Sequence, residues 1–204
     1  MKLCFTNKLQ VVIDLDLTLY DTDKGWFDWL NHVCDDFDFV RYQADLLADK
    51  VNYNLSVYFT LPEYLDPFLY WKDKDTYVHC ETHRFARNVI KNLYEAGFEI
   101  VFCSYCMGCP EQIKYKLTRL KSEFDFLLPD DFNFIPTRKK GLLKGAHIII
   151  DDRNEFLNQF GDDVLKIRYQ TPYTQDHVIE GEVVDCSNWN KVEDVICEWM
   201  EENL

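Results

Sequence analysis

Short apolar runs alternate with helical patterns through most of the 204-residue chain. Four of these runs predict buried strands, at about residues 9–13, 99–103, 147–150 and 164–169. Apolar residues at helical spacing predict helices at about 82–96, 110–121 and 191–200, with another helical stretch that ends at Phe160. This alternation predicts an α/β fold, a doubly wound parallel sheet whose ligands bind beyond the carboxyl ends of its strands.

The apolar faces of the predicted helices should pack on that sheet. In the helix over 110–121 this face would include Ile113, Leu117 and Leu120. In the helix over 82–96 it would begin at Phe85. Residues 122–146 are polar and marked by prolines, so we expect a loop there.

The pattern changes between the first predicted strand and the first predicted helix. From about residue 25 to 71, aromatic side chains are interleaved with acidic ones, without the alternation of a strand. We interpret residues 23–82 as a small, mostly helical cap, called the insert below. Residues 1–22 and 83–204 would then form the α/β core.

Composition and charge limit the classes of partner. Hydrophobic residues make up 47% and aromatic residues 16% of the chain, which suits a globular protein. The formal net charge of −14 argues against long nucleic acids, although a bound cation can reverse the potential inside one cleft. No apolar run approaches the roughly 18 residues of a membrane span. Eight cysteines without a signal peptide favour a reducing, cytoplasmic setting.

Polar side chains follow three of the predicted strands directly. Asp14 and Asp16 follow the first, Ser104 the second, and Asp151 and Asp152 the third. Each acidic pair alone is about equally compatible with a turn or a helix cap. In a doubly wound sheet, however, these strand ends meet in one crevice, where four carboxylates would repel one another unless a cation neutralised them. Mg²⁺, which takes hard oxygen ligands, is the expected cofactor.

Such a cluster indicates phosphoryl transfer. Asp14 would attack phosphorus in line and form an aspartyl phosphate. Asp16 would protonate the leaving oxygen and then activate water. A hydroxyl and a cation should bind the phosphoryl oxygens, and Ser104 and Lys140 fit these roles. Lys139 and Lys144 lie near Lys140, and for any one of these lysines a solvated loop is the alternative.

The ordered series Asp14-x-Asp16-x-Thr18, Ser104, a lysine and Asp151-Asp152 resembles the haloacid dehalogenase superfamily over most of the chain. The stretch KGLLKGAHIIIDDR at 140–153, with Thr171-Pro172-Tyr173 and Ser187-Asn188-Trp189, is similar to the 5′(3′)-deoxyribonucleotidases. The resemblance implies a magnesium-dependent phosphatase with Asp14 as nucleophile and Asp16 as acid–base group. It also implies that Asp14, Asp16 through its backbone, and Asp151 hold the metal, with Asp152 in support.

The same resemblance implies a substrate, a deoxyribonucleoside monophosphate whose base is held by aromatic residues of the cap. Phe68, Tyr70 and Trp71 are the first candidates and Trp26 the second, with ordinary core packing as the alternative. A second copy of the chain is a candidate partner. Another phosphate ester (a phosphoprotein, a sugar phosphate or a polynucleotide end) and a non-catalytic binding relative are the alternative functions.

Two positions depart from the family pattern, and one motif lies outside it. Leu17 stands where many relatives have glycine, and Tyr105 where the deoxyribonucleotidases usually have proline. Cys103, Cys106 and Cys109 have a spacing seen in metal sites but lack a fourth ligand, so we interpret them as thiols without a metal.

Overall fold

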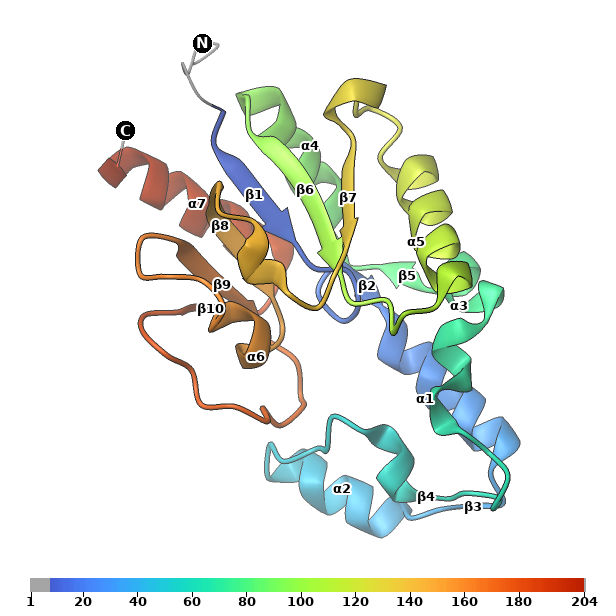
Figure 1. Ribbon diagram of the computed structural model, residues 1–204. Helices are drawn as coiled ribbons and strands as arrows, with labels where there is room; N and C mark the ends of the chain where they lie inside the picture. Colours follow the sequence, from blue (N-terminus) through green and yellow to red (C-terminus); the bar gives the residue numbers. More distant parts are fainter. Residues whose placement is uncertain (1–7, 204) are drawn as a thin grey trace.

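A six-stranded parallel sheet forms the centre of the computed structural model, which describes residues 8–203 (Figure 1). The strand order is β10-β9-β8-β1-β6-β7. The strands are β1 (Gln10–Ile13), β6 (Glu99–Ser104), β7 (Asn133–Pro136), β8 (Ala146–Asp151), β9 (Leu165–Tyr169) and β10 (Val184–Cys186). All neighbouring pairs are parallel, so their carboxyl ends lie at one edge of the sheet.

Helices cover both faces of the sheet. They are α4 (Ala86–Ala96), α5 (Pro110–Glu123), α6 (Asn154–Leu157) and α7 (Trp189–Asn203). Successive residues of β1 point to opposite faces: Val11 and Ile13 belong to the apolar cluster that includes α4 and α7, while Val12 belongs to the cluster that includes α6. The predicted doubly wound α/β fold is therefore confirmed.

Three details differ from the sequence-based expectation. Residues 133–136, within the expected loop, form the edge strand β7. Helix α4 begins at Ala86, because Phe85 has a left-handed φ of 72° and is 38% exposed. The expected apolar face of α5 is confirmed only for Leu120: Ile113 and Leu117 are partly buried, and the other buried residues of the helix are Gln112 and Lys116.

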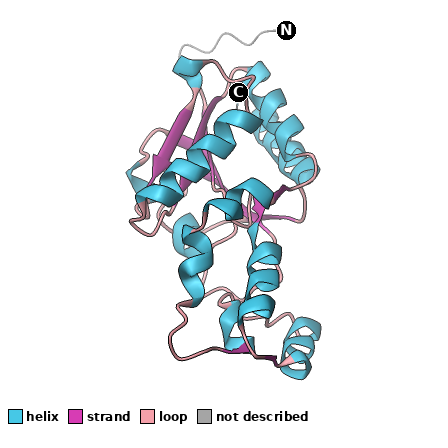
Figure 2. Cartoon of the chain, turned by 90° about the vertical axis from the view of Figure 1, so that its right-hand side faces the viewer, coloured by secondary structure: helices cyan, strands magenta, loops and turns pink. Residues whose placement is uncertain are grey.

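The insert is a second lobe that lies beyond the carboxyl ends of the strands (Figures 1 and 2). It lies between the antiparallel partners β2 (Tyr20–Asp21) and β5 (Glu81–Thr82). Its elements are α1 (Thr22–Val33), β3 (Asp36–Phe37), α2 (Phe39–Leu47), the 3₁₀ turns η1 (Leu55–Tyr58) and η2 (Pro67–Lys72), β4 (Phe59–Thr60), and α3 (Lys74–His79). Two more 3₁₀ turns lie in the core, η3 (Pro129–Asp131) and η4 (Lys140–Leu142).

Aromatic and aliphatic residues of the insert form their own apolar cluster, which includes Trp26, Leu30, Leu55, Tyr58 and Trp71. The insert also touches the core away from the β2–β5 junction. Thr174 N–H donates to Val51 O at 2.8 Å, and Val51 and Tyr173 form an isolated parallel bridge. Among the described residues, no helix has the length and apolar character that crossing a membrane requires.

Candidate active site

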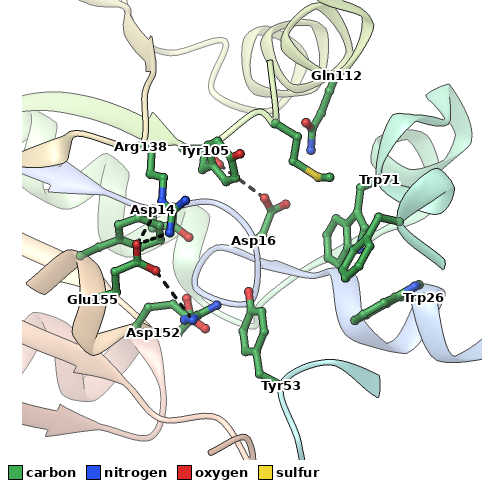
Figure 3. Close-up of a pocket in the computed structure, with 15 residues that line it drawn as sticks. Asp14, Asp16, Trp26, Tyr53, Trp71, Tyr105, Gln112, Arg138, Asp152 and Glu155 are labelled. Carbon is green, nitrogen blue, oxygen red and sulfur yellow. Dashed lines mark hydrogen bonds and ion pairs between the residues drawn. The ribbon is translucent and has the colours of Figure 1, made fainter. Parts of the chain in front are cut away.

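The carboxyl ends of β1, β6 and β8 open into a cavity of about 320 Å³ under the insert (Figure 3). Its core side is polar and includes Asp14, Asp16, Ser104 and Asp152. We call this side the floor. The opposite side, which we call the roof, is mainly aromatic and comes from the insert. The structure therefore brings the residues of three predicted strand ends to one place.

Three carboxylates form the centre of the floor. Asp14, Asp151 and Asp152 are all buried, and each offers a ligand atom within 4.8 Å of the others. The Lys140 ammonium donates to Asp14 and, at 2.5 Å, to Asp151 Oδ2. Thr18 Oγ1 donates to Asp152 Oδ1 at 3.3 Å. One ammonium thus bridges two of the carboxylates, and a threonine of the Asp14 loop supports the third.

Burial strongly perturbs these carboxylates. It raises the pKa of Asp14 to about 7, together with the charges of Asp151 and Asp16 and in spite of Lys140. Burial and the charges of Asp151 and Asp14 hold the pKa of Asp152 well above its usual range. Burial opposes the charge of Lys140, but the two carboxylates it contacts raise its pKa above the ordinary value. The floor is therefore short of positive charge.

The residues present fit a hard divalent cation. Three carboxylates face one ammonium, and within residues 8–203 the buried Asp152 Oδ2 has no hydrogen-bond partner. Carboxylate oxygens with unused lone pairs are the donors that Mg²⁺ prefers. An ion held by this group would offset the repulsion that raises the pKa of Asp14.

Asp16 lies to one side of this group, although it follows Asp14 by only two residues. Its Oδ1 accepts a hydrogen bond from the Tyr77 hydroxyl at 3.1 Å. Its Oδ2 accepts one from the Ser104 hydroxyl at 3.4 Å and pairs with the Lys116 ammonium. The side chain is thus directed toward α5, and the expected metal contact through its backbone stays a prediction.

The three candidate lysines occupy different surroundings. Lys140 is buried beside Asp14, whereas Lys139 and Lys144 are exposed. Lys140 also lies over the Phe156 ring, with 4.4 Å between Nζ and the ring centroid. Of these lysines, Lys140 is the one placed to meet a group that reacts with Asp14.

The roof contains three of the four aromatic residues expected to hold a base. Trp26, Phe68 and Trp71 line the cavity, and the Trp26 ring centroid lies 5.8 Å from that of Phe68 and 5.5 Å from that of Trp71. Tyr70 is not part of this lining: it is buried within the insert, where its hydroxyl donates to Thr22 O at 3.4 Å. Trp26 is fixed by a hydrogen bond from Nε1 to Pro67 O at 2.9 Å.

Several lining residues were missed by the sequence analysis. Arg138 and Arg153 lie at the rim, where Arg138 pairs with Glu155 at 2.6 Å and the Arg153 guanidinium lies 3.9 Å from the centre of the Tyr53 ring. Their positions in the sequence could have indicated them, because Arg153 directly follows Asp152 and Arg138 precedes Lys140 by two residues. Gln112 also lines the cavity. It was missed because the face of α5 was predicted from apolar residues.

Solved structures share this architecture. A Burkholderia xenovorans protein described as a haloacid dehalogenase-like hydrolase has a TM-score of 0.59 at 15% identity, over 95% of this chain and 99% of its own. A Thermotoga maritima protein described as a β-phosphoglucomutase has a TM-score of 0.56 at 11% identity, over 93% and 99%. A Clostridium difficile protein described as a phosphatase has a TM-score of 0.55 at 15% identity, over 94% and 100%. The chain has the haloacid dehalogenase fold. No family model and no curated protein matches the sequence.

Leu17 has a backbone conformation that is uncommon for leucine. Its φ of 66° lies in the left-handed region that favours glycine. The side chain is 5% exposed and belongs to the same apolar cluster as Trp26 and Val51 of the insert. Packing therefore offsets the backbone strain, and it links the loop after Asp14 to the insert.

Tyr105 and the cysteines also take defined places around the cavity. Tyr105 is 41% exposed and lines the cavity, beside Arg138. Cys103 and Cys106 are buried, and burial raises the pKa of their thiols to about 12 and about 11. Both are therefore protonated thiols at neutral pH, a poor state for binding metal.

Proposed function

We propose that this protein is a magnesium-dependent phosphomonoesterase that works through an aspartyl phosphate on Asp14. The observation that carries the proposal is the position of Asp14. Its carboxylate lies in the floor of the cavity, beside the Lys140 ammonium and within 4.8 Å of two further carboxylates. A nucleophilic carboxylate needs a neighbouring positive charge and open space in front of it, and this site offers both.

The residues divide the reaction between them. Asp14 attacks phosphorus and displaces the alcohol, and Ser104 and Lys140 bind the phosphoryl oxygens. Asp16 gives a proton to the leaving oxygen and later takes one from the water that hydrolyses the acyl phosphate. Asp14, Asp151 and Asp152, with the backbone of Asp16, would hold Mg²⁺. When bound, this ion would neutralise charge on the phosphoryl group and bring it close to Asp14.

The roof supports a nucleotide as the substrate, in first place a deoxyribonucleoside monophosphate. A cavity of about 320 Å³ has the size of a small-molecule site. Trp26, Phe68 and Trp71 offer faces and edges on which a base can stack. The rim arginines are already paired with carboxylates, so the aromatic wall is the main feature that favours a base over a sugar.

We also propose that the insert, residues 23–82, acts as a cap domain over a core of residues 1–22 and 83–204. Most buried residues of the insert's apolar cluster, among them Leu30, Leu55 and Tyr58, belong to residues 23–82, whereas Leu17 and Tyr173 come from the core. A lobe with its own apolar centre can shift against the core as a unit. This would let substrate reach a floor that is otherwise covered.

The first experiment is hydrolysis of p-nitrophenyl phosphate with magnesium by the wild type and by Asp14→Asn. A panel of ribo- and deoxyribonucleoside monophosphates, sugar phosphates and a phosphopeptide then ranks kcat/KM. The proposal expects magnesium-dependent turnover that Asp14→Asn abolishes, with deoxyribonucleotides ranked first. Another ranking would change only the proposed substrate. If no phosphate ester were hydrolysed, the alternative of a non-catalytic binding protein would be favoured.

A further inference from the structure

Lys116 is a second buried cation beside the cavity, on helix α5. Its side chain is 0% exposed, as is that of Lys140, yet in the described part of the chain it makes no hydrogen bond or ion pair with Asp14, Asp151 or Asp152. Its partners are the Asp16 carboxylate, Ser104 Oγ at 2.7 Å and Tyr105 O at 3.2 Å. Each lysine therefore serves a different part of the floor.

The contacts of Lys116 occupy its hydrogen-bonding capacity. An ammonium has three N–H donors, and these meet three acceptors. No donor is left to bind a phosphate oxygen unless one of these contacts breaks. The Ser104 hydroxyl, which accepts from Lys116, keeps its own proton free to donate toward Asp16 or toward a ligand.

Asp16 is fixed from two directions. Lys116 and Ser104, both from the core, meet its Oδ2, while Tyr77 from the insert donates to its Oδ1. Gln112, one turn before Lys116 on α5, holds Tyr77 by donating to its hydroxyl at 3.2 Å. In the view of Figure 3, Asp16 lies between Asp14 and Trp71, and Gln112 lies above it. The core and the insert thus meet at this carboxylate.

We propose that Lys116 is a positioning residue, which holds the acid–base carboxylate of Asp16 in place for proton transfer. This inference rests on the proposed phosphatase function. Burying an ammonium is costly unless it is well paired. The gain that offsets this cost here is the fixed orientation of the Asp16 carboxylate. Without it, Asp16 would rotate away from its partners, and proton transfer to the leaving oxygen would suffer most.

The test compares two leaving groups in the full chain. The nitrophenolate of p-nitrophenyl phosphate leaves without much protonation, whereas the alkoxide of glycerol 2-phosphate needs a proton. Lys116→Met should lower the rate of aspartyl phosphate formation from glycerol 2-phosphate, followed in a single turnover, by roughly 10- to 100-fold, with a loss at least about 5-fold smaller for p-nitrophenyl phosphate and little change in KM. Lys114→Met, at an exposed position of the same helix, is the matched control and should leave both rates unchanged.

A double variant separates positioning from other roles. Because Lys116 acts through Asp16, Asp16→Asn with Lys116→Met should be no slower than Asp16→Asn alone. The proposal would be overturned if the losses of the two single variants multiplied in the double variant, or if Lys116→Met lowered the rates on both substrates equally. A raised KM at normal kcat would also overturn it. The last result would make Lys116 a phosphate-binding residue.

Folding and the proposed function are controlled separately. The double variant leaves no unpaired buried charge, so it keeps the test valid if Lys116→Met alone unfolds: a further loss beyond that of Asp16→Asn would still overturn the proposal. Lys116→Arg, which keeps the charge, should recover part of the rate on glycerol 2-phosphate. If Asp14→Asn retains activity, the phosphatase proposal is wrong; if Asp14→Asn is inactive and losses multiply, only the role of Lys116 is wrong.

Discussion

The floor and the roof of the cavity are built on different principles. In the floor, Asp14 and Asp151 lie at the carboxyl ends of central strands, and the Lys140 ammonium pairs with both. In the roof, Trp26 and Trp71 are held by ring contacts and one side-chain hydrogen bond within the insert. Charges at fixed positions suit bond making and breaking, and an aromatic wall on a separate lobe suits recognition. Under the proposed function, substitutions of the aromatic residues of the roof should therefore change substrate choice more than the chemistry of the floor.

The largest effect that would sharpen this contrast is expected at Asp14, the proposed nucleophile. Asp14→Asn keeps the size of the side chain but removes the attacking charge, so hydrolysis of every substrate should fall by at least ~10³-fold. Circular dichroism should show an intact fold, and a beryllium fluoride adduct should form with the wild type only. Near-normal turnover by folded Asp14→Asn would replace the covalent mechanism with direct attack by water.

Removal of divalent cations should affect the floor almost as strongly. A chelator should lower turnover by about 10²-fold or more, because the three crowded carboxylates have one ammonium as counter-charge. Activity should return with Mg²⁺ and much less with Ca²⁺, which prefers larger and looser coordination. Thermal melting with and without Mg²⁺ gives a readout independent of turnover. Full activity in excess chelator would contradict the metal requirement.

The roof should respond selectively. Trp71→Ala removes a ring that lines the cavity, so kcat/KM for a nucleoside monophosphate should fall by about 10-fold or more, since a base stack contributes ~1–3 kcal/mol. Turnover of p-nitrophenyl phosphate should fall far less. Phe39→Ala, at an aromatic position of the insert that is 59% exposed, is the control. Equal losses on the two substrates would indicate that Trp71 contributes only to the packing of the insert.

The smallest expected effect is on the pH dependence of Tm, and it concerns Asp21 at the junction between core and insert. A hydrogen bond with Asp23, burial and the charge of Asp23 raise the pKa of Asp21 to about 7. Because the folded value exceeds the unfolded one, this carboxyl stabilises the protein fully below about pH 4, and the contribution is lost as the pH rises through about 7. Tm should therefore fall between about pH 4 and pH 7.

Asp21→Asn should flatten this dependence, because an amide donates to Asp23 without titrating. The difference is about 1 kcal/mol after screening by solvent, or ~2–4 °C in Tm. Lys24 and Tyr169 also face Asp21 and are unchanged in the variant. An identical pH profile of Tm in wild type and variant would show that Asp21 does not titrate there.

Sequence patterns revealed the central strands but not the edges. β1, β6 and β8 consist mainly of buried apolar residues, so their apolar runs identify them in the sequence. β7 ends at Pro136 and is only partly buried, and β10 has three residues, two of them exposed. Edge strands of this kind lack the apolar signal and form because a neighbour offers hydrogen bonds.

The same reasoning explains which site residues were found. Asp14, Ser104 and Asp151 follow strands, and the topology of a parallel sheet brings strand ends together. Lys116 lies on a helix, where polar residues are ordinarily assigned to solvent. Its burial depends on Asp16, a partner 100 residues away, and no local pattern encodes such a contact. Tyr70 was misplaced for a related reason, since neighbouring residues of a 3₁₀ turn point in different directions.

The bridge between Val51 and Tyr173 provides a way to measure how often the insert separates from the core. The Thr174 amide donates to Val51 O across the gap between insert and core, so its proton is shielded only while the two lobes stay together. Solvent deuterium can replace that proton only in the moments when the lobes separate. The exchange rate at one backbone position therefore measures how often the site opens, even without any substrate in hand.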